Sequence, residues 1–192
     1  MLIADAAIDV LGRDGLRALT HRAVDARAGL PQGTCSYHHR TRRSLLAAAL
    51  NRIADLDRAD MASTTADADA EGADGAGTDG TDADGAGGGV AGRAVAVLGR
   101  WLGPGRIRTR ARLVLMLDAE ARRDLGDEAA RLADEFVAGA TIALGDAGKA
   151  RLLVALLDGV VADHLIRGGD EPPGSGELRA RVAAVFAAVA AV

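Results

Sequence analysis

Apolar residues recur at helical spacing along most of the chain, and no useful stretch shows the apolar–polar alternation of a half-buried strand. Alanine supplies 43 of the 192 residues, whereas aromatic residues make up only 2%. Alanine is the best helix former and contributes little to a pleated sheet. The sequence therefore predicts an all-α protein.

Charge and cysteine content exclude several other classes of protein. The net charge of −4 excludes a bulk-basic nucleic-acid binder, although it leaves room for a local basic patch. The single cysteine, Cys35, forbids an intramolecular disulfide and a multi-cysteine zinc site. No signal peptide is visible, and the uncharged apolar run 182–192 is far shorter than the roughly 20 residues that span a bilayer. We expect a cytoplasmic protein with no membrane contact.

Residues 62–92 differ in composition from the rest of the chain. They hold seven acidic residues and nine glycines but no cation, and little apolar surface that could offset the entropy of ordering them. We predict a flexible acidic linker or loop here. Calcium ligation by the DxDxE and DGxxD spacings is a weak alternative, because no EF-hand loop with a terminal glutamate is present.

Helix start and stop signals divide the chain on both sides of this segment. Thr20 and Thr41 stand at N-cap positions, Gly29 at a helix end, and Pro31 at the first turn of a short helix that runs to His38. Gly12 to Gly15 end the first helix. Beyond the linker, the expected helices are Val90–Leu102, Arg108–Asp124, Asp127–Leu144, Lys149–Arg167 and Gly176–Val192.

The segment from Arg13 to Arg43 combines positive charge with a characteristic pair of helices. It holds seven arginines and only two acidic residues, Asp14 and Asp25. The two short helices that meet at Gly29 have the geometry of a helix-turn-helix, and the second is polar enough to suit a DNA major groove better than a protein core.

The motif LxxLT followed by RAVDARAGLPQGTCSYHHRTRRSLLAAAL is similar to the N-terminal domain of TetR-type (tetracycline-repressor-like) transcriptional regulators. The resemblance implies a three-helix helix-turn-helix head followed by a helical ligand-binding and dimerisation domain. The expected division is a DNA-binding domain at 1–58, which includes the connecting helix, the linker at 62–92, and the second domain at 93–192. Asp25 and His39 depart from the family, which usually has a small residue and Phe there, and we expect these departures to lower the stability of the head.

The resemblance and the residue chemistry together predict contacts with double-stranded DNA. Cationic side chains and helix N-termini neutralise phosphates, whereas an exposed amide reads a base edge; Gln32 is the candidate reader of adenine. Thr34 can touch a thymine methyl group or a phosphate, and Gly33 permits close backbone approach. The expected DNA-binding residues are Thr20, Arg22, Gln32, Gly33, Thr34, Tyr37, His38, Arg42 and Arg43.

The second domain is expected to hold an unidentified small-molecule effector and the homodimer interface. Trp101, Met116 and His164 are candidate pocket residues, although each suits a helix core or surface as well. The apolar helices Lys149–Arg167 and Gly176–Val192 predict a four-helix interface between two copies. These expectations describe a repressor that binds a palindromic operator and is released by its ligand.

Other functions have less support in the sequence. We expect no enzyme, cofactor or metal site, because no nucleophile–base spacing, phosphate-binding loop or histidine pair at i and i+4 occurs. His38 and His39 point about 100° apart on a helix and cannot chelate one ion well. Cys35 as a redox sensor is a minor possibility. The remaining alternative is a helical interaction module whose basic patch binds an acidic protein.

Overall fold

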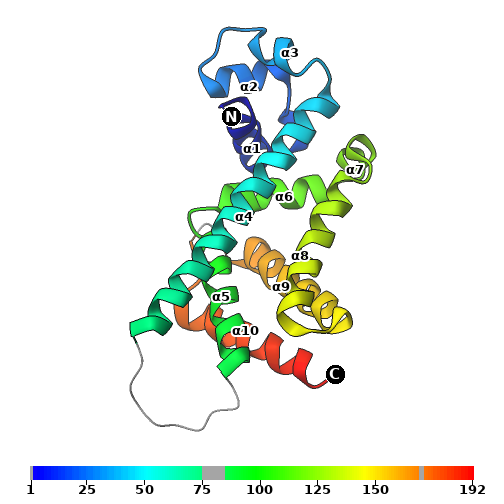
Figure 1. Ribbon diagram of the computed structural model, residues 1–192. Coiled ribbons are helices and arrows are strands. Elements are labelled where there is room, and N and C mark those ends of the chain that lie inside the picture. Colours follow the sequence, from blue (N-terminus) through cyan, green and yellow to red (C-terminus); the bar gives the residue numbers. More distant parts are fainter. Residues whose placement is uncertain (1, 75–84, 169–170) are drawn as a thin grey trace. The chain divides into compact units, whose positions relative to one another are not determined.

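The computed structural model describes residues 2–74, 85–168 and 171–192, and every regular element in these ranges is a helix (Figure 1). The all-α prediction is confirmed. In chain order the elements are α1 (Leu2–Asp14), the short 3₁₀ helix η1 (Leu16–Ala18), α2 (His21–Ala28), α3 (Thr34–His38), α4 (Arg42–Asp74), α5 (Gly85–Leu102), α6 (Arg106–Leu117), α7 (Ala119–Leu125), α8 (Glu128–Leu144), α9 (Ala147–Arg167) and α10 (Ser175–Ala190).

The chain forms two compact units. The first comprises Met1–Asp57 and Pro104–Glu135, and the second comprises Arg58–Gly103 and Phe136–Val192. Helices α6 and α7 and the start of α8 therefore pack with the N-terminal helices, although the sequence analysis grouped them with the second domain at 93–192.

Close packing of α1 on α6 explains this grouping. A β-carbon at Gly12 would collide with the carbonyl oxygen of Ile107, so glycine is needed where the two helices cross. The prediction that Gly12 helps to end the first helix is wrong, because Gly12 lies inside α1 and the helix ends at Asp14. Gly15 follows with φ +83°, a left-handed conformation that favours glycine. The unit's core also buries Leu11, Val24, Leu45, Leu46, Leu50 and Ile53.

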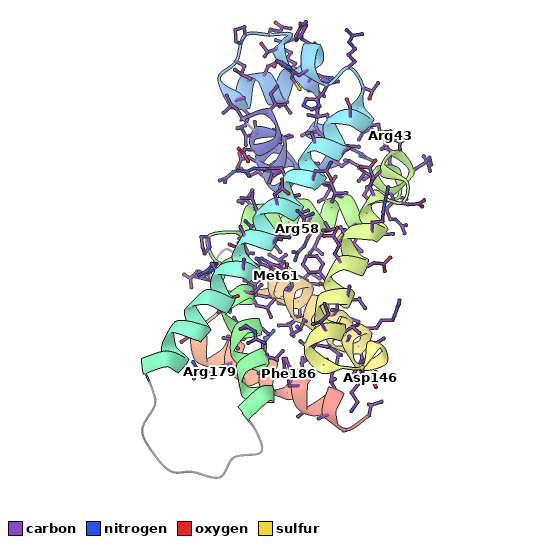
Figure 2. The ribbon with its side chains drawn as sticks, viewed as in Figure 1. Arg43, Arg58, Met61, Asp146, Arg179 and Phe186 are labelled. Carbon is purple, nitrogen blue, oxygen red and sulfur yellow. The ribbon has the colours of Figure 1, made fainter. Side chains whose placement is uncertain are left out.

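The second unit is built around α5, α9 and α10. Leu153 of α9 forms a buried cluster with Val185 and Val189 of α10, and the neighbouring Phe186 packs against it (Figure 2). Trp101 at the end of α5 meets Phe136 edge to face, with ring centroids 5.7 Å apart. Burial of these apolar side chains stabilises the unit.

The helix predicted over Arg108–Asp124 is wrong as a single element, because the structure divides it at Asp118. The Asp118 carboxylate accepts hydrogen bonds from the backbone N–H groups of Glu120 (2.8 Å) and Ala121 (3.1 Å), and so caps α7. The spacing of apolar residues did not reveal this break, because Leu117 and Ala121 keep helical spacing across it. Leu117 is in fact 69% exposed.

Helix extends into both ends of the segment expected to be a linker. Residues 62–74 continue α4 and residues 85–92 begin α5. The high helix propensity of alanine accounts for the extension of α4, since residues 62–71 contain no glycine or proline. The centre of the expected linker, 75–84, lies outside the described residues.

Candidate nucleic-acid interface

Local capping signals fix both ends of α2. The Thr20 side chain accepts a hydrogen bond from the backbone N–H of Ala23 at 3.1 Å, as an N-cap residue does. Gly29 adopts φ +65°, and its backbone N–H donates to the carbonyl oxygens of Asp25 and Ala26 in the last turn of α2. The predicted cap at Thr20 and the predicted end at Gly29 are confirmed.

The third helix begins later than predicted. Gly33 has φ +98°, so the chain turns through residues 31–33, and α3 starts at Thr34 instead of Pro31. Gln32 is exposed in this turn, just before the helix. The turn places the candidate base reader at the N-terminal end of α3, the end of a recognition helix that contacts base edges.

Asp25 ties α2 to α3 through a buried carboxylate. Its side chain is 2% exposed, and it accepts hydrogen bonds from the backbone N–H groups of Gly33 (2.8 Å) and Cys35 (2.7 Å). The two bonds satisfy donors at the start of α3 that would otherwise have no partner in the helix. The expectation that Asp25 lowers the stability of the head is wrong, because the carboxylate fixes the orientation of α3.

The remaining candidate residues of α3 lie at the surface. Tyr37 is 77% exposed and its ring meets the exposed His38 ring edge to face, with centroids 5.2 Å apart. The Thr34 hydroxyl donates a hydrogen bond to the carbonyl oxygen of Pro31 at 2.7 Å. That bond occupies the only proton of the hydroxyl, which favours the thymine-methyl contact over a phosphate contact for this residue.

The arginines near the head differ in their ionic partners. Arg22 and Arg40 are exposed and make no ion pair within the described residues. Arg42 pairs with Glu120 of α7, and Arg43 lies 3.8 Å from Glu128 of α8. Arg43 is labelled at the start of α4 in Figure 2. All nine candidate residues therefore lie on the helix-turn-helix or at the start of α4. Among the three candidate arginines, Arg42 and Arg43 have carboxylate partners, whereas Arg22 has none within the described residues.

Cys35 and His39 lie against the core of the head. Burial raises the pKa of the Cys35 thiol, and the charge of Asp25 adds to this effect. A thiol with a raised pKa is a poor nucleophile, which argues against redox sensing. Burial also lowers the pKa of His39, so this side chain is neutral near pH 7.

A buried ionic cluster joins α4 to α6 in the first unit and was missed by the sequence analysis. The Asp57 carboxylate, 1% exposed, lies 2.7 Å from Nη1 of Arg112 and 3.0 Å from Nε of Arg108. A signal was present, because Asp57 continues the apolar stripe that contains Leu50 and Ile53, where a buried acid needs a cationic partner. The cluster positions the helix that begins at Arg42.

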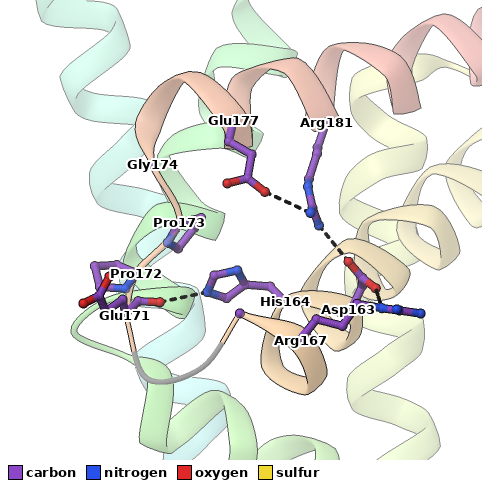
Figure 3. A pocket seen from close by; sticks show the side chains of 10 residues that line it. Asp163, His164, Arg167, Glu171, Pro172, Pro173, Gly174, Glu177 and Arg181 are labelled. Carbon is purple, nitrogen blue, oxygen red and sulfur yellow. Dashed lines mark hydrogen bonds and ion pairs between the residues drawn. The ribbon is translucent and has the colours of Figure 1, made fainter.

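The three candidate pocket residues do not share one unit. Trp101 and His164 lie in the second unit, whereas Met116 lies on α6 in the first. His164 lines a polar pocket of about 380 Å³ at the end of α9, where its Nε2 lies 3.1 Å from the carbonyl oxygen of Glu171 (Figure 3). Ion pairs from Asp163 to Arg167 and Arg181 border the same pocket.

In the part of the chain that the structure describes, no three or more His, Cys, Asp or Glu side chains lie together so that they could hold a metal ion. No helix of the same residues is both long and apolar enough to cross a membrane.

Known proteins resemble this chain in sequence and in fold. The family model described as the tetracyclin repressor-like C-terminal domain matches residues 87–191. A search of curated protein sequences finds no match. Among solved structures, a TetR family member from Streptomyces coelicolor A3 is 32% identical; the match covers 96% of this chain and 95% of that chain, with a TM-score of 0.72.

Two more solved structures extend the comparison. The multidrug binding protein EbrR, complexed with imidazole, is 32% identical over 96% of this chain and 92% of its own, with a TM-score of 0.66. EbrR is also matched in complexes with ethidium, malachite green and proflavin. A transcriptional regulator from Rhodococcus sp. Rha1 is 21% identical over 98% of this chain and 94% of its own, with a TM-score of 0.71, and supports the fold alone.

Proposed function

The chain belongs to the TetR family of transcriptional regulators, and from that premise we propose that it binds a palindromic DNA operator as a homodimer and is released by a small-molecule ligand. It acts as a repressor in this proposal. The observation that carries the proposal is the arrangement of α3, whose inner residue Cys35 is fully buried while Gln32, Tyr37 and His38 are exposed beside it. A short helix held at its base and polar on its outer side suits insertion into a major groove.

DNA binding is separated from the interaction-module alternative by comparing two polyanions. Fluorescence anisotropy of the purified chain would be measured with a labelled random-sequence duplex and with labelled polyglutamate, each across a salt series. We expect duplex binding that weakens steeply with salt, because counterions are released from phosphates. Tighter binding of polyglutamate than of the duplex would favour a module for acidic proteins.

Replacing Gln32 with alanine is expected to relax the preference for one base pair in each half-site. The loss of a bidentate amide–adenine contact reduces discrimination at that position by about tenfold or more. Anisotropy with single-base variants of a selected operator measures the change. Ser36→Ala is the matched control, because the exposed Ser36 hydroxyl donates to the carbonyl oxygen of Gly33 at 3.0 Å. If Gln32→Ala discriminates between base pairs as the wild type does, another residue reads the base.

The outer faces of α9 and α10 support the proposed homodimer. One face of α9 carries three exposed residues at helical spacing, namely Ala155, Gly159 and Ile166, the last of which is 80% exposed. This face points away from the core residue Leu153. Small side chains allow helices from two copies to approach closely, and a twofold axis would pair the same face on each subunit. Helix α10 also exposes alanines at helical spacing on one face, namely Ala180, Ala183, Ala184, Ala187 and Ala188.

Gly159→Arg is expected to convert the dimer to a monomer. A β-carbon at Gly159 meets no atom within 4 Å, so the arginine fits the isolated subunit and obstructs only a partner. Light scattering at micromolar concentration measures the mass. Gly139→Arg is the matched control, because Gly139 of α8 is also an exposed helical glycine with nothing within 4 Å. A wild-type monomer, or a Gly159→Arg dimer, would contradict the interface.

The ligand is proposed to be a small aromatic molecule that binds in the second unit, where Trp101 and His164 are the candidate contacts; Met116 lies in the first unit and is not proposed as a contact. The EbrR complexes with ethidium, malachite green and proflavin support this class of ligand. Trp101 is the only tryptophan in the sequence and is packed on Phe136, so its fluorescence reports on this part of the second unit.

We expect ethidium to quench Trp101 fluorescence in a saturable way and to raise the unfolding temperature of the protein. A ligand that binds only the native state stabilises it by about 2.7 kcal/mol at 100 times its Kd. The titration is done without DNA, because planar dyes stack between base pairs. Quenching that rises linearly without saturation, with no change in unfolding temperature, would rule out this dye as a ligand.

A further inference from the structure

In the protein without DNA, Arg42 and Arg43 are each paired with a carboxylate. Nη1 of Arg42 contacts Oε1 of Glu120, and Nη2 of Arg42 lies 3.5 Å from the carbonyl oxygen of Leu16. Nη2 of Arg43 lies 3.8 Å from Oε1 of Glu128. Both terminal nitrogens of Arg42 therefore face oxygen atoms of the protein, and the same N–H groups are the ones that would bind phosphate oxygens of DNA.

The start of α4 holds these two arginines in place. The backbone N–H of Ser44 donates to Oγ1 of Thr41 at 3.1 Å, and the Thr41 N–H lies 3.3 Å from Oγ of Ser44. This reciprocal cap fixes the first turn of α4, so Arg42 and Arg43 leave the helix at defined points. Arg22 and Arg40, by contrast, have no ionic partner within the described residues.

We propose that Glu120 and Glu128 form a carboxylate latch that competes with DNA phosphates for Arg42 and Arg43. The inference rests on the proposed function and adds a regulatory contact to it. Binding of DNA requires each arginine to exchange a carboxylate for a phosphate, so the latch lowers the affinity for every sequence alike. Phosphate contacts carry no sequence information, so the latch leaves base preference unchanged.

The latch links the head to the region that matches a ligand-binding family. Helices α7 and α8 fall within residues 87–191, which match the tetracyclin repressor-like C-terminal domain, yet Glu120 and Glu128 contact the first turn of α4. Any movement of α7 or α8 that brings the carboxylates closer to the arginines strengthens the competition, and any movement away weakens it. Exposed ion pairs contribute little energy, so DNA can displace the carboxylates.

The test measures binding of a fluorescent random-sequence duplex, which isolates phosphate contacts from base reading. Glu120→Gln is expected to raise the affinity about two- to fivefold, and Glu128→Gln by less because the Arg43 pair is longer. The gain should shrink as salt is raised from about 50 to 200 mM, because salt screens exposed ion pairs. In an Arg42→Gln background, Glu120→Gln should have no effect.

Asp127→Asn is the matched control, because it makes the same charge change one residue before Glu128, and Asp127 makes no ion pair within the described residues. An equal gain in Asp127→Asn would show a general charge effect and overturn the latch. Unchanged duplex affinity in both Glu120→Gln and Glu128→Gln would also overturn the latch. Reduced affinity would overturn it as well, because it would show that the carboxylates position the arginines for DNA. A wild-type chain that binds no duplex at low salt would overturn the proposed function and the latch together.

Discussion

Asp57→Ala is expected to destabilise the protein by about 3–5 kcal/mol, because it removes a buried carboxylate that both Arg108 and Arg112 contact. Arg112 is 3% exposed and Arg108 is 13% exposed, so neither guanidinium can recover full hydration in the folded protein. Thermal unfolding followed by circular dichroism should show a decrease in the unfolding temperature of about 10 °C.

Asp5→Ala is the matched control for this prediction. Asp5 also pairs with an arginine of α4, Arg52, but its side chain is 42% exposed. Exposed pairs contribute at most about 1 kcal/mol, so the unfolding temperature should change little. If Asp57→Ala unfolds at the same temperature as Asp5→Ala, the buried cluster does not stabilise the contact between α4 and α6.

Asp25→Ala is expected to reduce the affinity for a selected operator by about 100-fold, toward the level of non-specific binding. The substitution leaves the N–H groups of Gly33 and Cys35 without their carboxylate, at a cost of about 1–3 kcal/mol for each unsatisfied donor. Helix α3 contains only five residues and cannot hold its conformation without such contacts. Anisotropy with operator and random duplexes measures the specificity ratio.

Two further variants define the cause of this loss. Asp25→Asn keeps one acceptor oxygen and should bind with intermediate affinity. Asp14→Ala removes the same charge from an exposed acid that pairs with Arg27, and should bind the operator as the wild type does. Wild-type specificity in Asp25→Ala would show that α3 is oriented by other contacts.

Local signals predicted much of the fold because they act over one helix turn. The Thr20 cap, the Gly29 terminus and the start of α4 after Thr41 each depend on residues within four positions of one another. The exposed positions of Gln32 and Tyr37 also follow from a short polar helix with few core residues.

Tertiary contacts account for what the sequence did not predict. The hydrogen bonds of Asp25 were not predicted, because its two partners, Gly33 and Cys35, lie eight and ten residues away across a turn. The pairing of Asp57 with Arg112 spans 55 residues, and Arg42 with Glu120 spans 78. Periodicity within one helix gives no information about which distant helix will face it, so these pairs require the structure.

The most direct test of the central claim is a selection of binding sites from a random duplex library by the purified chain, followed by footprinting on the recovered sequence across a salt series. We expect a palindrome whose half-site centres lie about 34–36 Å apart or a multiple of that distance, with protection that weakens steeply as salt rises. A selection that enriches no sequence, with equally weak binding to every duplex, would contradict the assignment of this chain as a sequence-specific regulator.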